Sequence, residues 1–325
     1  MQKLSRPVRR VAYYLRNMTH DGMPQWLYRR RLPVLLEHFA RHPSPDIVER
    51  VRHCNRLTSP FRPSANARPI ARLPMRKSYY YYDLKEYARY FQRSCRLDFI
   101  FGDVTDVPSC PTLVKSRPIH GENANSVLMN FDKLRHFRLG IVPDDLAFAD
   151  KRPMAVWRGD ANNPRRRKLV EAALGSRLCD VGFTTGDVPD QLRRPRMSVA
   201  GQLGYRYVIS VEGNDVATNL KWIFASGSLC LMPAPSYETW FMEGTLQPGV
   251  HYAALKPDFS DLDEVVAHYE SHPDEARQII ANANAHFRRF GDAATERLVS
   301  LLVLYKFLAL SGQIEPDERI MAALA

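Results

Sequence analysis

Residues 207–233 constrain the fold of this chain more than any other stretch. They open with Tyr207–Val211, an apolar and β-branched run that predicts a buried strand. Turn formers follow at Glu212–Asp215, and apolar residues at helical spacing then predict a helix over Val216–Ser226. A second apolar run, Leu229–Met232, predicts another strand. Strand, glycine-containing turn, helix and strand together make half of a nucleotide-binding α/β layer.

The turn inside this unit is a candidate phosphate site. Ligands of such layers lie at the carboxyl ends of the strands, where the first N–H groups of the next helix point at a phosphate. This predicts contacts from Gly213, Asn214 and the backbone of Asp215, Val216 and Ala217. From this segment alone, an ordinary strand–helix–strand crossover that binds nothing is the slightly better interpretation.

The charge of the chain limits its partners. Its 46 Lys and Arg against 35 Asp and Glu give a net charge of +11, which indicates an anionic partner such as nucleic acid, phospholipid headgroups or a phosphorylated substrate. No apolar run is long enough to span a bilayer. The first residues lack the apolar core of a secretory signal, and the five cysteines are scattered. We therefore expect a cytoplasmic protein with reduced thiols.

Metal-ligand patterns are weak. His38 with His42 and His268 with His272 have the i, i+4 spacing of helical ligands, but no third ligand stands nearby. The segment Asp261–Asp263 reads DLD, yet it opens a predicted helix and resembles a capping box with Ser260. We therefore predict no metal site and no obligatory cofactor.

The N-terminus predicts a basic amphipathic helix over residues 2–18. One stripe of this helix is apolar and the arginines fall mostly elsewhere on the wheel; the stripe consists of Leu4, Val8, Val11, Leu15 and Met18. Two interpretations stay open. The stripe lies on an anionic membrane surface, or it docks on the chain's own domain.

Further strands surround the central unit. Residues 97–101 end in Gly102-Asp103-Val104, and 111–119 predict a strand that carries Lys115 and Arg117. Residues 154–157 predict a strand before the loop Arg158–Asn163, in which Asn163 is the expected N-cap and Pro164 the first residue of a basic helix. We place a domain boundary near residue 150, which divides the chain into 1–150, 151–310 and a tail, 311–325. Residues 236–244 predict a short helix with two carboxylates.

The order of several segments resembles glycosyltransferase family 90. These segments are WRGDANNPRRR, YRYVISVEGNDVATNLKW, ASGSLCLMP, YETWFMEG, PGVHY and DFSDLDEVV, and the upstream FGDVTDVP and VKSRPI are similar to the bacterial lipopolysaccharide-core branch. The resemblance covers residues 97–290. It implies an α/β fold with two Rossmann-like domains facing across a cleft (GT-B-type). It also implies a UDP-sugar donor in the C-terminal half, an acceptor in the N-terminal half, no obligatory metal, and inversion of the anomeric centre.

The resemblance also implies roles for single residues. Inverting transfer needs a base for the acceptor hydroxyl, and FGDVTDVP is similar to the segment that carries the family's catalytic aspartate. This implies Asp103 as the base, with Asp106 as the alternative. Lys115 and Arg117 would lie on the acceptor side.

The donor side follows in the same way. Arg158 and Arg166 bracket the loop that contains Gly159, and guanidinium groups suit a diphosphate. The family's donor contacts in this loop correspond to Asp160 and Arg166.

Two more donor positions lie further along the chain. Asn219 stands where the family often has arginine, and Lys221 follows two residues later. Glu238 or Glu243 would accept hydrogen bonds from ribose hydroxyls, or would be surface residues of an amphipathic turn.

These observations predict a membrane-peripheral hexosyltransferase on the inner face of the cytoplasmic membrane. It would move a hexose from a UDP-sugar to a lipopolysaccharide-core oligosaccharide, a lipid-linked and phosphorylated acceptor that suits the basic charge. The alternative is a non-catalytic basic protein that binds a polyanion or nucleic acid on an α/β scaffold. The arginines are spread over several segments and no motif that reads nucleic acid is present, so we expect no nucleic-acid partner.

Overall fold

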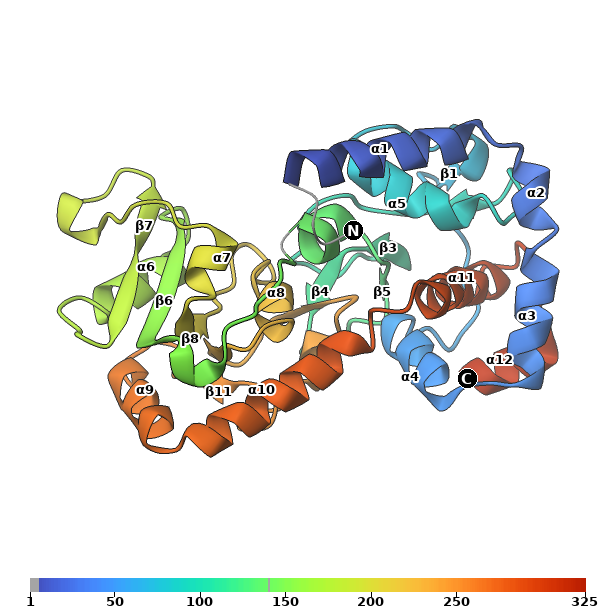
Figure 1. Ribbon diagram of the computed structural model, residues 1–325. Coiled ribbons are helices and arrows are strands. Elements are labelled where there is room, and N and C mark those ends of the chain that lie inside the picture. Colours follow the sequence, from blue (N-terminus) through green and yellow to red (C-terminus); the bar gives the residue numbers. More distant parts are fainter. Residues whose placement is uncertain (1–5, 140) are drawn as a thin grey trace. The chain divides into compact units, whose positions relative to one another are not determined.

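The computed structural model describes residues 6–139 and 141–325, which form two compact units (Figure 1). The helical unit contains residues 6–134, 237–242 and 290–325. The sheet unit contains residues 135–236 and 243–289. This division differs from the predicted boundaries, because 135–150 belong to the sheet unit and everything after residue 289 belongs to the helical unit.

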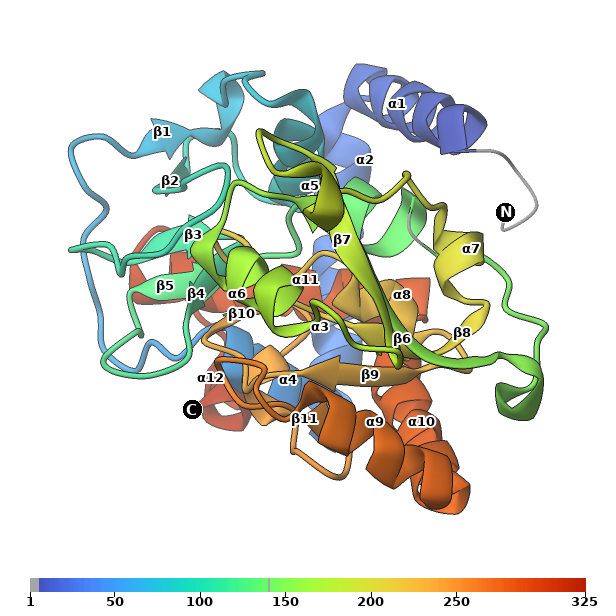
Figure 2. The ribbon, with the colours of Figure 1, turned by 90° about the vertical axis from the view of Figure 1, so that its left-hand side faces the viewer.

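The sheet unit is built on five parallel strands in the order β11-β9-β8-β6-β7 (Figures 1 and 2). The strands are β6 (Arg152–Asp160), β7 (Cys179–Thr185), β8 (Tyr205–Ile209), β9 (Leu229–Met232) and β11 (Ala253–Ala254). The helices are α6 (Pro164–Ala172), α7 (Val199–Gln202), α8 (Leu220–Phe224), α9 (Leu262–Ser271) and α10 (Pro273–Arg288). This unit confirms the predicted parallel α/β layer.

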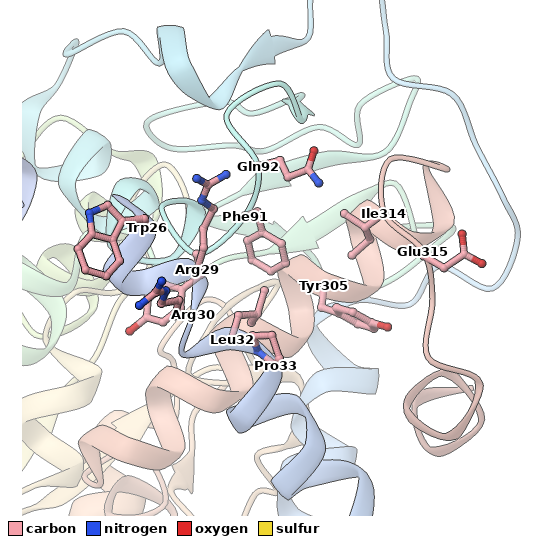
Figure 3. A pocket seen from close by; sticks show the side chains of 11 residues that line it. Trp26, Arg29, Arg30, Leu32, Pro33, Phe91, Gln92, Tyr305, Ile314 and Glu315 are labelled. Atoms are coloured by element: carbon pink, nitrogen blue, oxygen red, sulfur yellow. The ribbon is translucent and has the colours of Figure 1, made fainter. Parts of the chain in front are cut away.

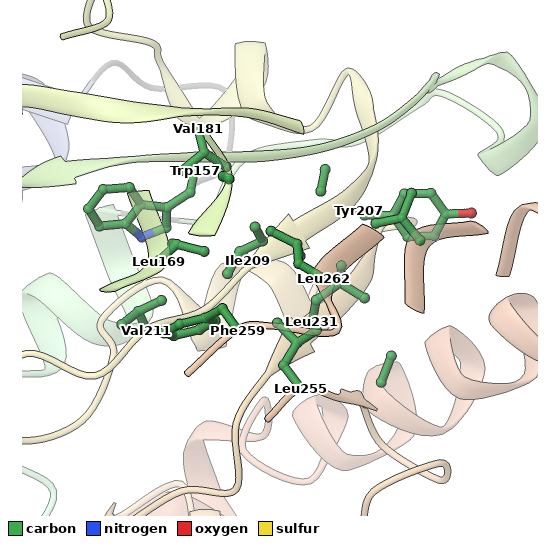
Figure 4. Packing of buried hydrophobic residues seen from close by; sticks show 14 of the residues in the cluster. Trp157, Leu169, Val181, Tyr207, Ile209, Val211, Leu231, Leu255, Phe259 and Leu262 are labelled. Atoms are coloured by element: carbon green, nitrogen blue, oxygen red, sulfur yellow. The ribbon is translucent and has the colours of Figure 1, made fainter. Parts of the chain in front are cut away.

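The core of the sheet unit explains why its strands read as continuous apolar runs. All four residues of β9 are buried, since helices cover both faces of a parallel sheet. Trp157 of β6, Ile209 of β8 and Leu231 of β9 lie in one cluster with Leu169 of α6 and Leu262 of α9 (Figure 4).

Local predictions in this unit hold for the strands and fail for the central helix. The strand at 229–232 is confirmed, and the one predicted at 207–211 begins two residues earlier, at Tyr205. The helix begins at Leu220 rather than Val216, so residues 210–219 form a loop. The side chain of Asn219 closes this loop, because its Nδ2 donates to the carbonyl of Ile209 (2.9 Å) and its Oδ1 accepts from the hydroxyl of Ser210 (3.1 Å).

Other predicted helix and strand boundaries also differ from those in the structure. Strand β6 continues through Arg158–Asp160, which had been predicted as loop. The capping box at Ser260–Asp263 is wrong: the N-cap of α9 is Asp261 without a side-chain cap, and Asp263 accepts a hydrogen bond from Ser176 (2.6 Å).

The helical unit is organised around α11 (Ala293–Leu310). This helix is apolar on almost every side, which is typical of a helix buried on all faces, and it packs against α4 and α5. The other helices are α1 (Arg6–Gly22), α2 (Gln25–Arg29), α3 (Leu32–Arg41), α4 (Pro45–Cys54), α5 (Ser78–Ala88) and α12 (Glu318–Leu324). Helix α12 replaces the predicted tail, and Lys306 of α11 holds it by donating to the carbonyl of Leu324 (2.8 Å).

The described strands of the helical unit form three pairs. The pairs are β1 (Arg68–Pro69) with β2 (Arg96–Leu97), β3 (Thr112–Val114) with β5 (Ser126–Leu128), and β4 (Ser116–Pro118) with β10 (Tyr237–Thr239). Only β3 and β5 run parallel among these. A second Rossmann-like sheet is therefore not seen in the described part of this unit. That two lobes face each other across a cleft stays a prediction.

Strand β10 replaces the helix predicted over 236–244. Its residues pair antiparallel with β4, Glu238 opposite Arg117, so a hexapeptide from the second half of the chain completes the helical unit. The alternating Tyr-Glu-Thr pattern suits a strand once a partner edge is available.

A pocket of about 520 Å³ opens in the helical unit beside α2 and α3 (Figure 3). Its lining combines aromatic and charged side chains, among them Trp26, Arg29, Arg30, Phe91 and Glu315. Among the described residues, none of the helices is both long and apolar enough to cross a membrane.

Candidate active site

The sheet unit has a topological switch point between β6 and β8. The chain leaves β6 toward β7 on one side and returns to β8 on the other, so the loops after β6 and β8 diverge at the carboxyl ends of neighbouring strands. Open α/β sheets bind their ligands at such a point. The two segments singled out from the sequence, 158–166 and 212–219, contain residues of these two loops.

The two loops contact each other directly. Asn163, the N-cap of α6, accepts from the backbone N–H of Arg165 (2.9 Å), as predicted, and its Nδ2 donates to the carbonyl of Gly213 (2.9 Å). Arg165 pairs with Glu212, which had not been predicted, and Glu212 also accepts from the backbone N–H of Ser236 (2.9 Å). The start of α6 is thereby fixed against the turn that follows β8.

Arg166 lies at the meeting point of these loops. A Cβ atom built on Gly213 would lie 2.8 Å from its Nη2, so the guanidinium sits directly against the glycine backbone. Its Nη1 reaches Asn162 Oδ1 at 3.4 Å, while its buried Nε has no hydrogen-bond partner among the described residues. Burial lowers the pKa of Arg166, and the charge of Asp160 partly offsets this. A partly satisfied cation at a switch point suits an anionic ligand.

The other predicted residues lie at the carboxyl end of β6, and their surroundings differ from those of Arg166. Arg158 is turned toward β7, where its Nη2 pairs with Asp180 (2.6 Å) and its Nε donates to the carbonyl of Pro195 (3.1 Å). Gly159 has no room for a side chain, because its Cβ would lie 2.4 Å from the Trp157 ring. Asp160 is exposed and accepts a hydrogen bond from Thr185. Among the three residues predicted here, Asp160 is the one whose polar side chain faces solvent.

The loop after β8 also separates exposed from buried positions. Asn214 is exposed, whereas Asp215, Val216 and Ala217 are buried. Because α8 begins at Leu220, the backbone of 215–217 belongs to the loop, and the predicted helix N-terminus at these residues is wrong.

Lys221 does not face this loop. It is fully buried in an ion pair with Glu243, whose side chain is buried as well. These two charges neutralise each other in the interior, which argues against a phosphate contact for Lys221 and a ribose contact for Glu243.

Glu238 and Arg117 form a buried ion pair inside the helical unit. Neither side chain has exposed surface, and Arg117 Nε donates to Glu238 Oε1 at 2.8 Å. The carboxylate is completed by His53 Nε2 (2.7 Å) and Arg56 Nη2 (3.3 Å). This closed network argues against Glu238 as a ribose ligand and against Arg117 as an acceptor contact.

Asp103 is paired with Lys115 in the helical unit. Lys115 Nζ donates to Asp103 Oδ1 at 2.5 Å; the lysine is 1% exposed and the aspartate 35%. The preceding Gly102 has φ +119°, a left-handed conformation that favours glycine. The loop is anchored through Ser116 Oγ, which accepts from the N–H of Val104 (3.2 Å). An oriented, solvent-reachable carboxylate of this kind can take a proton.

Asp106, the alternative base, is exposed and accepts a hydrogen bond from the neighbouring Thr105 hydroxyl (3.2 Å). Among the described residues, no group of three or more His, Cys, Asp or Glu is arranged to hold a metal ion.

Comparison with known proteins identifies the family. The sequence profile of glycosyl transferase family 90 matches residues 133–305, more than half of the chain. O-glucosyltransferase LpsA from Dichelobacter nodosus is 44% identical over 323 residues, which cover 97% of this chain and 99% of that protein. The chain belongs to glycosyltransferase family 90.

More distant relatives match a smaller part of the chain. Protein O-glucosyltransferase 2 from Danio rerio is 32% identical over 143 residues, 41% of this chain and 28% of that protein. Protein O-glucosyltransferase 3 from Homo sapiens is 28% identical over 141 residues, 41% of this chain and 27% of that protein. The family profile contains the whole sheet unit and begins after Asp103.

Some side-chain pairs of this family 90 chain could not be predicted from the sequence. The partners of Glu238 include His53 and Arg56, about 180 residues away, and Asp180 was not identified as the partner of Arg158. Such pairs leave no local spacing signal, because the fold alone brings them together. By contrast, the Asn163-Pro164 cap and the glycine turn at 213 are local patterns, and both were identified.

Proposed function

We propose that this family 90 chain transfers a hexose from a UDP-sugar to a hydroxyl of a lipopolysaccharide-core or similar glycan, with inversion at the anomeric carbon. The proposal takes glucose as the hexose, since the relatives that match are O-glucosyltransferases by name. The observation that carries it is the contact of Arg166 with Gly213 at the switch point of the sheet. That position suits the diphosphate of a nucleotide-sugar.

In this proposal the sheet unit holds the donor. Arg166 stabilises the negative charge that develops on the diphosphate, and its Nε, which has no partner in the part of the chain that the structure describes, offers a further donor. Asn214 on the loop after β8 and Asp160 at the end of β6 are both exposed and contribute polar contacts to the donor. Arg158, Asn219, Lys221 and Glu238 are given structural roles, because their side chains already have protein partners.

Asp103 acts as the base. Its carboxylate takes the proton of the acceptor hydroxyl while the hydroxyl oxygen forms a bond to C1 and the bond from C1 to the phosphate oxygen breaks. Attack from the side opposite the leaving diphosphate inverts the configuration. Lys115 positions the carboxylate through its 2.5 Å hydrogen bond. UDP leaves without the help of an obligatory metal in this scheme.

A thermal-shift panel of UDP, GDP, CMP and UDP-glucose tests the donor. A ligand that binds the folded state stabilises it by about 2.7 kcal/mol at a hundred times its Kd. We expect UDP and UDP-glucose to raise Tm and GDP and CMP not to. A rise with GDP or CMP alone would overturn the UDP assignment. The non-catalytic alternative would be supported if none of the four ligands raised Tm and the chain bound polyanions with a steep salt dependence.

A further inference from the structure

Helix α1 exposes its apolar stripe. Val8, Val11, Leu15 and Met18 recur every three or four residues and are 47–58% exposed. This spacing places them on one face of the helix. An exposed, ordered row of large apolar side chains is unfavourable in water, so it indicates a surface that something covers.

The opposite face of α1 is fixed to the helical unit. Arg9, Tyr13 and Asn17 are buried there. The hydroxyl of Tyr13 donates to Asp83 Oδ1 of α5 at 2.8 Å. The outward direction of the stripe is therefore set by packing on the other side. The interpretation that the stripe docks on the chain's own domain is wrong for these four residues.

The charge around the stripe is strongly positive. Residues 6–31 contain seven arginines against one carboxylate, Asp21, and that carboxylate accepts a hydrogen bond from Tyr81 (3.0 Å). Arg10 and Arg16 of α1 are exposed, as are the three arginines at 29–31. Exposed basic groups beside an apolar row are complementary to a surface that is both anionic and apolar.

The exposed apolar surface continues along the chain beyond α1. Met23 and Trp26 are exposed, and the guanidinium of Arg30 lies 4.8 Å from the centre of the Trp26 ring (Figure 3). Tryptophan and arginine side by side are typical of the boundary between lipid headgroups and acyl chains. Residues 8–34 hold seven of the twelve large apolar side chains that are exposed in the described part of the chain.

We propose that α1, together with Met23 and Trp26, is the surface by which this chain lies on an anionic phospholipid bilayer. The helix lies parallel to the membrane, the stripe enters the headgroup region, and the arginines contact lipid phosphates. A nucleic acid would use the arginines but would leave the Val, Leu and Met stripe in water. This inference deepens the proposed function, since a bilayer surface is where a lipid-linked acceptor is found.

Vesicle co-sedimentation of the full chain tests the proposal. The probes are phosphatidylcholine vesicles with and without phosphatidylglycerol. We expect binding that requires phosphatidylglycerol and weakens with salt. The double variant V11E/L15E should bind at least roughly tenfold more weakly, because carboxylates replace the inserted side chains. The matched control is L146E/L174E, which adds the same charge at two exposed apolar positions of the sheet unit and should bind like wild type.

Folding and donor binding are checked in the same samples. Both double variants should keep the wild-type Tm and the stabilisation by UDP; if V11E/L15E unfolds, V11S/L15S takes its place. The proposal is overturned if wild type does not sediment with phosphatidylglycerol vesicles, or if V11E/L15E binds them like wild type. It is also overturned if L146E/L174E loses binding equally, or if the stripe variants abolish only self-association or oligonucleotide binding. Vesicle binding without any UDP stabilisation would overturn the proposed function alone.

Discussion

Arg117 Nε donates a hydrogen bond of 2.8 Å to Glu238 Oε1 across 121 residues of sequence, and neither side chain has exposed surface. The pair ties β10 to β4. It explains why residues 237–242 leave the sheet unit and complete the helical unit. Both residues had been predicted at binding surfaces, whereas the structure buries them in an ion pair inside the helical unit.

Glu238→Ala should destabilise the protein by about 3–5 kcal/mol, because removal of one partner leaves Arg117 as an uncompensated buried charge. Urea unfolding measures this loss. Arg277→Ala breaks an exposed ion pair with Asp274 and should change stability by less than about 1 kcal/mol. A Glu238→Ala protein that keeps its stability but no longer binds UDP would restore Glu238 to the donor site.

The same pair predicts an acid dependence of stability. Burial opposes the ionisation of Glu238, but the hydrogen bond with His53 and the charge of Arg117 outweigh it and lower its pKa from 4.5 to about 2. A carboxyl with a lowered folded-state pKa stabilises the protein above its unfolded pKa, and this contribution is lost as pH falls from about 4.5 to about 2. Between pH 4.5 and 2, the free energy of unfolding of Glu238→Gln should therefore fall by about 3 kcal/mol less than that of wild type. Urea unfolding at a series of pH values measures both. If the free energies of unfolding of the two proteins fall in parallel with pH, the ionisation of Glu238 does not contribute to the acid dependence.

Asp103→Asn should lower kcat by roughly 10²–10⁴, since the amide cannot take the proton of the acceptor hydroxyl. Stabilisation by UDP should persist, because Asp103 belongs to the helical unit and the donor loops to the sheet unit. The readouts are turnover of UDP-glucose and the UDP thermal shift. Asp106→Asn is the matched control and should retain turnover. The reverse pattern would move the base to Asp106.

Arg166→Ala should weaken UDP binding by about 10–100-fold, as expected for the loss of charge-assisted hydrogen bonds to a diphosphate. Isothermal titration measures the change. Arg167→Ala removes the same charge from the next, exposed position of α6 and should bind UDP like wild type. Equal weakening by both variants would mean that the basic helix acts through its overall charge.

Gly213→Ala should weaken UDP binding roughly tenfold with little loss of stability. The added Cβ would lie 2.8 Å from Arg166 Nη2, so the flexible end of the arginine must move while the backbone can stay. Combining Gly213→Ala with Arg166→Ala should give no further loss, because both changes act on one guanidinium. Additive losses of UDP affinity in the titration would show that the two residues act independently.

The sequence by itself determined the parts that depend on neighbours along the chain. The strand at 229–232, most of the strand predicted at 207–211, the Asn163-Pro164 start of α6 and the glycine turn at 213 all followed from local pattern. These signals suffice for one parallel layer, because the period of apolar residues and the capping residues act within a few positions. Family 90 membership also followed, from the order of several such segments.

The tertiary structure decided what each charged side chain does. Lys221 and Glu238 look like ligands in the sequence, yet partners brought by the fold bury them in ion pairs. The sequence left two interpretations of the α1 stripe open, and the packing of Tyr13 against α5 directs the stripe outward. The physical reason is the same in each case: burial and pairing depend on residues distant in sequence, and spacing along the chain carries no record of them.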